Sequence, residues 1–383
     1  MSALYSWSRF GLRTAAAAAG RASTPTKLIF VVTKRCHSRC VYCDIWKVKD
    51  TPGGLDNELS LEEVRKVAAA NPFLQWIDFT GGEPTDRPDF VEVVQAFSDA
   101  CPDLLVVHFP TNGIATKRIT ETVQKLQASL RAQLVVTVSI DGPPELNDRL
   151  RGIRNDFAHA VDTFASLRRL LGPGQVFVGM TLHGHKASTG LTTSELVEST
   201  FAAVNAALVQ RQEAPIDWGT FHLNIPHLSQ HYYGNSASGE KSTEKDGFGG
   251  EVHRAEIAAA LRLAANKPKH GGAPVMRAVE RIYRAEAMKY LATGKTSITC
   301  SALLSTSYLS EKGEVYPCTI WDQPLGNVRD SNYALMPHIE AARRNGIRQA
   351  VVEQKCPNCW TPCEAYPAIG ASPGRALLAL AHG

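Results

Sequence analysis

Apolar runs rich in β-branched residues recur along the first 224 residues, and segments with helical spacing of apolar residues lie between them. The runs span residues 27–33, 75–80, 104–110, 133–139, 176–182 and 217–224. Strands that alternate with helices favour a parallel sheet with helices packed on its outside. The pattern therefore predicts an α/β barrel, or an open part of one, with six strands.

The elements beyond and between these runs carry their own signals. Ser60 and Glu63 form a capping box at the start of a predicted helix. Residues 232–250 are rich in Gly, Ser, Lys and Glu, which predicts a mobile loop. Helical patterns follow over 251–265 and 274–292, and a hairpin is predicted from 305–309 and 314–317.

The composition is that of an ordinary globular protein, with 44% hydrophobic and 20% charged residues. Its 383 residues are enough for one large domain and a smaller one. The net charge of +4 is mild and no basic run stands out, so we expect no nucleic-acid partner. No apolar run reaches the length of a transmembrane segment.

The first 26 residues contain no Asp or Glu, carry Arg9, Arg13 and Arg21, and include an alanine run over 15–19. This composition suits a mitochondrial-type transit peptide, a membrane-surface helix or a disordered bacterial N-terminus. We predict a cytoplasmic protein in which residues 1–26 form a flexible or peripherally associating tail.

Eight of the nine cysteines fall into two groups, which indicates metal binding in a reducing cytoplasm rather than disulfides. The ninth, Cys101, is expected to be a buried, inert thiol. The first group is Cys36, Cys40 and Cys43, with the spacing CxxxCxxC directly after the first predicted strand. Three thiolates are one fewer than a cubane iron–sulfur cluster normally takes, so one iron would stay open for another molecule. A zinc knuckle or a chance triplet is the alternative.

This spacing, with the aromatic Tyr42 before the third cysteine, resembles the signature of the radical S-adenosylmethionine (SAM) superfamily. The resemblance implies a partial (β/α)6 TIM-like barrel over residues 27–231 and a 4Fe-4S cluster bound by the three cysteines. In that family the open iron binds SAM, and reductive cleavage of SAM gives a 5′-deoxyadenosyl radical that abstracts hydrogen. A reductant such as flavodoxin or ferredoxin is implied as a partner.

Residues at the ends of successive strands extend this resemblance. In a parallel barrel the loops at the carboxyl ends of the strands converge on one opening. The residues that we expect to bind SAM are Tyr42, Gly81, Gly82, Glu83, Pro84, Asn112, Ser139 and Arg151.

Two parts of this set have roles in the family. The GGEP segment, residues 81–84, holds the methionyl amino group of SAM there, and its glycines would let a ligand approach the main chain. Ser139 and Arg151 resemble the pair that binds the SAM carboxylate, for which a planar guanidinium is well suited. Arg149 and Arg154 are alternatives to Arg151. Asp141 is expected to order the loop.

The second cysteine group contains Cys300, Cys318, Cys356, Cys359 and Cys363. Its spacing resembles the SPASM or twitch extension of radical SAM enzymes, and it implies a small iron–sulfur domain over residues 294–368. A full SPASM module has seven cysteines, so one auxiliary 4Fe-4S cluster on the first four of these five fits better. Cys363 would be able to replace Cys356 or Cys359. A structural zinc site is the alternative. Residues 232–293 would link the two domains, and 369–383 would form a tail.

The candidates for catalytic acid–base residues lie at and after the sixth predicted strand, and they are His222, His227, His231 and Tyr232. His183 and His185 follow the fifth. Histidine titrates near neutrality and suits proton transfer, whereas a packed or solvated histidine is the alternative for each.

The implied function is radical-based, oxidative modification of a peptide, a protein or a small metabolite. The 26 residues before the first strand are too few for a folded peptide-recognition domain, which favours a substrate without its own leader. Recognition of a peptide by a separate partner protein is the alternative. The alternative is a non-catalytic iron–sulfur protein that carries electrons or acts as a scaffold. GGEP and the pair Ser139 and Arg151 argue against this alternative, because an electron carrier needs no SAM pocket.

Overall fold

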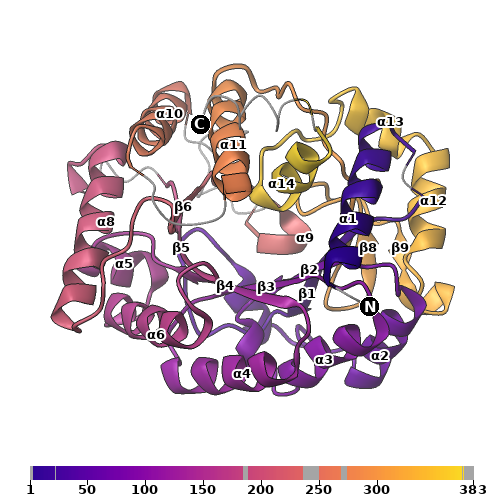
Figure 1. Ribbon diagram of the computed structural model, residues 1–383, viewed down its shortest axis with the longest axis horizontal. Coiled ribbons are helices and arrows are strands. Elements are labelled where there is room, and N and C mark those ends of the chain that lie inside the picture. The colour runs from indigo at the N-terminus through magenta and orange to yellow at the C-terminus, as the bar shows by residue number, and fades with distance from the viewer. Residues whose placement is uncertain are drawn as a thin grey trace.

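The computed structural model describes residues 3–21, 23–183, 189–235, 250–268, 274–372 and 374. Within these residues nine strands form one sheet in the order β6-β5-β4-β3-β2-β1-β7-β8-β9. The strands are β1 (Lys27–Thr33), β2 (Trp76–Gly81), β3 (Val106–Thr111), β4 (Gln133–Ser139), β5 (Val176–Thr181), β6 (Phe221–Asn224), β7 (Thr306–Leu309), β8 (Glu314–Tyr316) and β9 (Gly326–Asn327). The sheet curves around the centre of the molecule, and most helices lie on its outer side (Figure 1).

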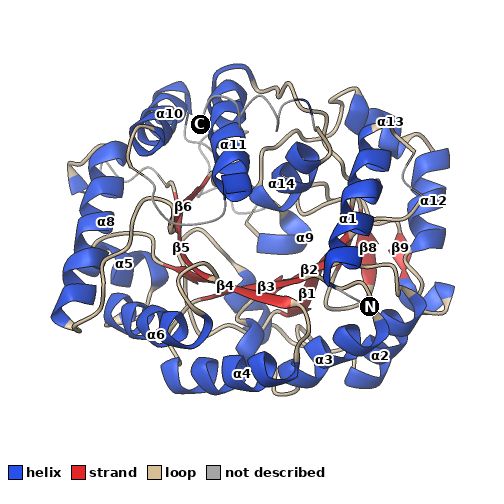
Figure 2. Cartoon of the chain, in the orientation of Figure 1, coloured by secondary structure: helices blue, strands red, loops and turns tan. Residues whose placement is uncertain are grey.

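Helices surround the strands on most sides in this view (Figure 2). In the barrel they are α2 (Leu61–Ala70), α3 (Phe90–Ala100), α4 (Thr116–Ser129), α5 (Pro144–Arg151), α6 (Asp156–Leu171) and α8 (Thr193–Gln210). After β6 come α9 (Gln230–Tyr233), α10 (Gly250–Ala265), α11 (Pro274–Thr293), α12 (Met336–Arg344), α13 (Ile347–Val352) and α14 (Pro362–Gly370). Short 3-10 helices are η1 (Ile45–Asp50), η2 (Pro84–Asp86) and η3 (Val328–Ser331).

The first six strands run parallel, each paired with its neighbour in chain order. Strands β6 and β9 are the two edges, so the sheet is not closed. This arrangement confirms the predicted partial barrel. The sixth strand is shorter than predicted, because Asp217 forms a turn in which its carboxylate accepts a hydrogen bond from Gly219 N at 2.9 Å.

Strand β1 is buried along its whole length, and its two faces serve different cores. Leu28, Phe30 and Val32 belong to the large core beneath the outer helices. Ile29 and Val31 belong to a small inner cluster that also contains aromatic side chains from α9, β7 and β8. The period of two in a strand thus separates the helix-facing side of the sheet from its inner side.

The segment that carries the second cysteine group continues the same sheet. β7 pairs in parallel with β1, with Lys27 opposite Thr306, and β8 pairs antiparallel with β7. The predicted hairpin turns at Gly313, which has a φ of +85°. At the level of backbone pairing, the predicted C-terminal domain is therefore an extension of the barrel.

The N-terminal segment differs from the predicted flexible tail, because residues 3–18 form helix α1 (Ala3–Ala18). Arg9 forms an ion pair with Asp103 at 2.5 Å. Arg13 donates hydrogen bonds to the carbonyl oxygens of Phe73 and Pro25. These contacts hold the helix against the loops at the amino ends of β2 and β3.

Several expectations fall on residues outside the described ranges. They are the greater part of the predicted mobile loop, at 236–249, His185, and most of the tail at 369–383. Within the described part of the chain, no helix combines the length and the apolar character needed to cross a membrane.

Candidate functional site

The loop after β1 alternates between enclosed and exposed side chains. Cys36 is half-buried and Cys40 is 8% exposed. His37, Arg39 and Val41 are exposed to solvent. The loop therefore turns its thiols toward the protein and its basic side chains toward the outside.

This cysteine loop rests on the carboxyl end of α5. The main-chain N–H groups of Arg39 and Val41 donate to the carbonyl oxygens of Arg151 and Leu150, each at 2.9 Å. Helix α5 ends at Gly152, which has a φ of +69° and lies so near Arg39 that a Cβ would come within 2.7 Å of the Arg39 carbonyl oxygen. The end of one helix thus fixes the centre of the loop.

The GGEP segment lies against the start of the same loop. Gly82 N donates to Thr33 O at 2.9 Å, and Glu83 N donates to Arg35 O at 2.8 Å. A Cβ on Gly82 would stand 2.0 Å from Arg35 O and 3.1 Å from the Cβ of Cys36. The sequence suggests that these glycines allow the approach of a ligand. In the structure, Gly82 packs against Arg35 at the start of the cysteine loop, and Gly81 packs against Thr33 at the end of β1.

Glu83 joins the second and third strand ends. Its buried carboxylate accepts hydrogen bonds from Asn112 N at 2.7 Å, from Thr85 Oγ1 at 2.7 Å and from Thr111 Oγ1 at 3.0 Å. Burial raises the pKa of Glu83, although these donors oppose the shift. Pro84, the next residue, begins η2 and is buried. Glu83 and Asn112, both expected to bind SAM, are thus linked to each other.

The three thiols suit a cluster better than a single ion. Burial raises the pKa of Cys36 and Cys43 to about 12 and also raises that of Cys40, so a metal would have to displace their protons on binding. Among the described residues, no three Cys, His, Asp or Glu side chains gather closely enough to hold one metal ion. A cubane takes one thiolate per iron, which requires more widely separated sulfurs than a mononuclear site does. Three thiols on one loop are a donor set that a 4Fe-4S cluster with one open iron would use.

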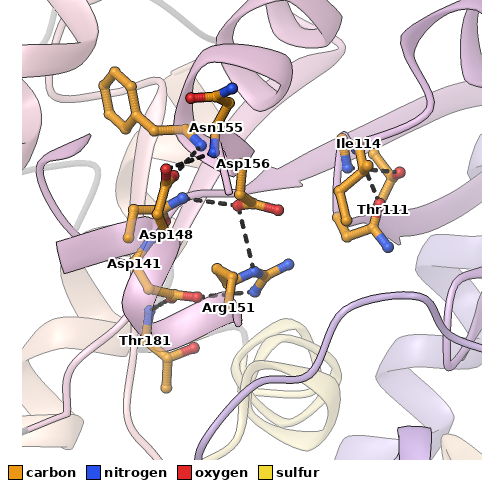
Figure 3. A network of polar contacts seen from close by, with 12 residues as sticks. Thr111, Ile114, Asp141, Asp148, Arg151, Asn155, Asp156 and Thr181 are labelled. Atoms are coloured by element: carbon orange, nitrogen blue, oxygen red, sulfur yellow. Dashed lines mark hydrogen bonds and ion pairs between the residues drawn. The ribbon is translucent and has the colours of Figure 1, made fainter. Parts of the chain in front are cut away.

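A polar network connects the cysteine loop to β4 and α5. Arg151 Nη1 donates to Asp141 Oδ2 at 2.9 Å and to the Tyr42 hydroxyl at 3.2 Å. The Tyr42 hydroxyl also bonds to Asp141, whose other oxygen accepts from Thr181 N at 2.8 Å. Figure 3 shows Asp141 between Arg151 and Thr181, with Asp156 on the other side of the guanidinium. Asp141 thus ties β5, α5 and the cysteine loop together.

This network bears on the expected SAM carboxylate site. Arg151 is buried and its guanidinium is engaged with Asp141, with Asp156 Oδ2 at 3.9 Å from its Nε. Ser139 ends β4 and is half-buried. A carboxylate ligand at Arg151 would therefore share the guanidinium with an internal carboxylate. The alternatives Arg149 and Arg154 are exposed.

The ring of His183 stacks on Tyr42, with centroids 3.9 Å apart and planes at 18°. His183 follows β5, as predicted, and Tyr42 lies in the cysteine loop. The sequence places both residues at strand ends but carries no signal that they pair. The stack brings the fifth strand end to the cysteine loop.

The candidate catalytic residues after β6 do not share one location. His222 Nδ1 lies 3.4 Å from Glu280 Oε1 of α11, and burial lowers the pKa of His222. Burial lowers the pKa of His227 to about 4. His231 bonds through Nδ1 to Asp322, and its pKa is lowered by burial although Asp322 opposes the shift. All three rings thus favour the neutral form.

Helix α9, which carries His231 and Tyr232, lies near the centre of the molecule, below α14 in the view of Figure 1. Its Tyr233 carbonyl oxygen accepts from Asp44 N at 2.9 Å, next to Cys43. On the other side His231 Nε2 lies 3.1 Å from Cys318 O, and the His231 ring stacks on Tyr316 at 4.1 Å.

Tyr232 packs into the inner cluster with Ile29 and Val31, and its hydroxyl bonds to Thr80. Cys43 and Cys363 both pack against this cluster. Sequence reasoning proposed Tyr232 for chemistry, whereas the structure places its ring in a packed core between the two groups of thiols.

Four of the five distal cysteines line one cavity, and they are Cys300, Cys318, Cys356 and Cys359. Burial raises the pKa of the Cys359 thiol to about 12. Arg348 Nη1 donates to Cys300 O at 2.7 Å, which fixes the main chain at one side of the cavity. The four cysteines that line the cavity are the same four that the sequence predicts as ligands of the auxiliary cluster.

Cys363 is not among the residues that line this cavity. Its carbonyl oxygen accepts a hydrogen bond from Lys27 Nζ at 3.0 Å, and the same ammonium forms an ion pair with Asp78 at 2.7 Å. Lys27 is almost completely buried at the first position of β1. Cys363 is therefore attached to the inner side of the barrel.

Comparison with known proteins identifies a family that part of this chain matches. The model of the radical SAM superfamily matches residues 30–188. GTP 3′,8-cyclase of Cronobacter sakazakii is 37% identical over 116 residues, which cover 29% of this chain and 32% of that protein. Mycofactocin maturase MftC of Mycobacterium ulcerans is 33% identical over 144 residues, which cover 37% and 36%. The chain thus matches these relatives over about a third of their length.

A solved structure described as native anSMEcpe with bound AdoMet has a similar fold. Its TM-score is 0.55 with 13% sequence identity, and the match covers 94% of this chain and 100% of that chain. The likeness extends past the matched family region into the part of the chain that carries the second cysteine group.

Proposed function

Because residues 30–188 form a radical SAM domain, we propose that this chain is an enzyme that cleaves SAM reductively and uses the 5′-deoxyadenosyl radical to remove a hydrogen atom from its substrate. The contact between the cysteine loop and the GGEP segment carries this proposal. In it Gly82 and Glu83 donate main-chain hydrogen bonds to the residues just before Cys36. An electron carrier has no need of that segment.

Cys36, Cys40 and Cys43 would hold the 4Fe-4S cluster that this family uses with SAM. When bound, the cluster supplies the one electron that breaks the sulfur–C5′ bond of SAM. The chain itself orients the cysteine loop through the end of α5, and it shields the Cys40 thiol from water, since Cys40 is buried. Enclosure of this kind limits side reactions of a radical.

We assign SAM binding to residues that surround the enclosed side of this loop. The main chain of residues 81–84 would hold the methionyl amino group, and Ser139 and Arg151 would bind the carboxylate. Glu83 would act by positioning Asn112, to which its carboxylate is bonded. Tyr42 would act by holding the Asp141 and Arg151 pair against the cysteine loop.

We further propose an auxiliary 4Fe-4S cluster on Cys300, Cys318, Cys356 and Cys359. Their position around one cavity supports this ligand set. The loss of a hydrogen atom leaves a substrate radical, and an oxidative outcome requires that one more electron leaves it. The auxiliary site is the electron acceptor that such an outcome needs, with anchoring of the substrate as the alternative role.

The substrate class that we propose is a peptide, a protein or a small metabolite. The partly matching relatives bear the names of a peptide maturase and of a GTP cyclase, so they support both kinds of substrate. His222, whose pKa is lowered by burial, is a candidate for a proton acceptor from the oxidised substrate.

The test is anaerobic reconstitution with iron and sulfide, followed by addition of SAM and dithionite. We expect 5′-deoxyadenosine to form, and the variant Cys36→Ala to form none at equal protein concentration. A fully loaded wild-type protein that binds SAM without releasing 5′-deoxyadenosine would overturn the enzyme proposal in favour of an electron-transfer or scaffold protein.

A further inference from the structure

Glu364 lies in the wall of the cavity that four of the distal cysteines line. The residue is 3% exposed. Its Oε2 accepts a hydrogen bond from Thr306 Oγ1 at 2.5 Å, whereas its Oε1 is enclosed and has no hydrogen-bond partner among the residues that the structure describes. A buried carboxylate oxygen of this kind has lost its bonds to water and gained none in exchange. The cavity wall therefore contains an oxygen donor that no described residue engages.

The sequence around Glu364 would give this side chain a different role. Thr361 is the N-cap of α14 and Glu364 occupies the third helical position, which is the spacing of a capping box. Glu63 of α2 and Glu195 of α8 occupy the same position, and both bond back to their N-cap residues. Thr361 caps α14 without a side-chain hydrogen bond. Glu364 thus lines the cavity in place of the helix-capping role that its position favours.

Two cations lie near Glu364 but bind other groups. Burial raises the pKa of Glu364 to about 7, although Lys27 and Arg348 oppose the shift. The Lys27 ammonium forms an ion pair with Asp78, and the Arg348 guanidinium donates to the carbonyl oxygen of Cys300. A metal ion in the cavity would offset the burial of this carboxylate, because buried charges in proteins are paired or coordinate metals.

The charge of Glu364 acts on three of the cysteines that line the cavity. Burial, followed by this carboxylate, raises the pKa of Cys300 and Cys318, and the carboxylate also contributes to the raised pKa of Cys359. Cys356 is half-buried and lies between two exposed residues. The four irons of a cubane occupy the corners of a tetrahedron, so a donor that faces three of the ligands is suited to the fourth corner.

We propose that Glu364 Oε1 is a fifth protein ligand of the auxiliary 4Fe-4S cluster, on the same iron as Cys356. The proposal rests on the auxiliary cluster of the proposed function and adds one oxygen donor to its four thiolates. The bond forms between the carboxylate and iron, any proton on the carboxylate passes to water, and no electron moves. An iron with two protein ligands keeps one when the other is removed. Cys356 is therefore the one cysteine of the four that the cluster does not require.

The experiment measures iron content and EPR spectra after anaerobic reconstitution of the full chain. The variants are Cys356→Ala, Glu364→Gln and the double variant Cys356→Ala/Glu364→Gln. Glutamine keeps an acceptor oxygen for Thr306 Oγ1, but its neutral amide is a poorer iron ligand than a carboxylate. Glu340→Gln, at an exposed position on α12, is the control. The cluster on the first cysteine group reports in every variant that the chain has folded.

We expect about eight iron atoms per chain in the wild type and in each single variant, and about four in the double variant. Glu364→Gln should also shift the g values of the reduced auxiliary cluster, which Glu340→Gln should leave unchanged. About four iron atoms in Cys356→Ala alone, or unchanged g values in Glu364→Gln, would overturn the proposal.

About eight iron atoms in the double variant would overturn it as well, in favour of Cys363 as the replacing ligand. A wild type with about four iron atoms and the EPR signal of one cluster would instead overturn the auxiliary cluster of the proposed function, and this ligand with it. The two failures are therefore distinguished by the iron content of the wild type.

Discussion

Gly82 lies so close to Arg35 that a Cβ at position 82 would stand 2.0 Å from the Arg35 carbonyl oxygen. The contact joins the segment after β2 to the start of the cysteine loop. The close packing of one backbone on another therefore explains why position 82 is a glycine, without a ligand. Such a contact is sensitive to a single methyl group.

We predict that Gly82→Ala forces this loop away and costs about 1–3 kcal/mol of unfolding free energy, as overpacked sites do. The reconstituted variant should also hold less iron than the wild type. Gly174→Ala is the matched control, because no heavy atom lies within 4 Å of the added Cβ. Denaturant unfolding and iron analysis check both, and equal values for the two variants would contradict the packing argument.

Replacing Glu83 by Gln should weaken the connection between the second and third strand ends. An amide has one acceptor oxygen where the carboxylate has two, so a hydrogen bond to Thr85, Thr111 or the main chain of Asn112 is lost. We expect a loss of about 1–3 kcal/mol in unfolding free energy and weaker binding of SAM in calorimetry. Glu92→Gln, at an exposed position on α3, should change neither quantity.

The distal cysteines should differ in their effect on iron content. The reconstituted wild type should contain about eight iron atoms per chain, four for each cluster. Cys359→Ala removes a residue that lines the cavity and should leave about four, whereas Cys363→Ala should keep about eight. Loss of iron from the Cys363 variant alone would reverse the proposed ligand set. A zinc content of about one with four iron atoms would replace the auxiliary cluster by a zinc site.

Asp156 gives the folded protein a pH dependence. Burial raises its pKa from 3.8 to about 6, although Arg151 opposes the shift. The folded state thus favours the protonated acid, so the associated stability is complete below about pH 4 and is lost as the pH rises to about 6. Two pH units correspond to about 3 kcal/mol at most.

Asp156→Asn keeps an acceptor for Asn147 Nδ2, which lies 2.7 Å from Asp156 Oδ2, and does not ionise. Between pH 4 and pH 7 we expect the variant to gain stability relative to the wild type. Denaturant unfolding of the metal-free protein checks this, with the exposed Asp50→Asn as the control. A constant difference between variant and wild type across this range would refute the assignment.

The strands and helices of the barrel can be predicted from the sequence because each depends on a short, local pattern of residues. Residues 27–33 and 133–139 are strands with the predicted bounds, and the capping box of Ser60 and Glu63 is present at the start of α2. The match of residues 30–188 to the radical SAM superfamily model likewise agrees with short motifs, CxxxCxxC and GGEP. Each of these features depends on residues within a few positions of one another.

Contacts between residues far apart in the sequence cannot be predicted in this way. The bond from His231 to Asp322 joins residues 91 positions apart, and nothing in the chain near His231 names that partner. Tyr42 and His183 are both placed at strand ends by the sequence, but their stack depends on how two loops fold. The pairing of β7 with β1 also cannot be predicted from local sequence, because many strands have residues suited to such a pairing.

Strand β1 connects a region near the first group of thiols to a region near the second. Its carboxyl end leads into the loop of Cys36, and its first residue, Lys27, binds the main chain of Cys363. Seven residues of extended chain span about 20 Å at the usual rise of a strand. Inserting or deleting a pair of residues in β1 would keep its two faces in place and change this span by about 7 Å. The length of β1 therefore sets the distance between the start of the cysteine loop and Lys27, the residue whose ammonium binds the carbonyl oxygen of Cys363.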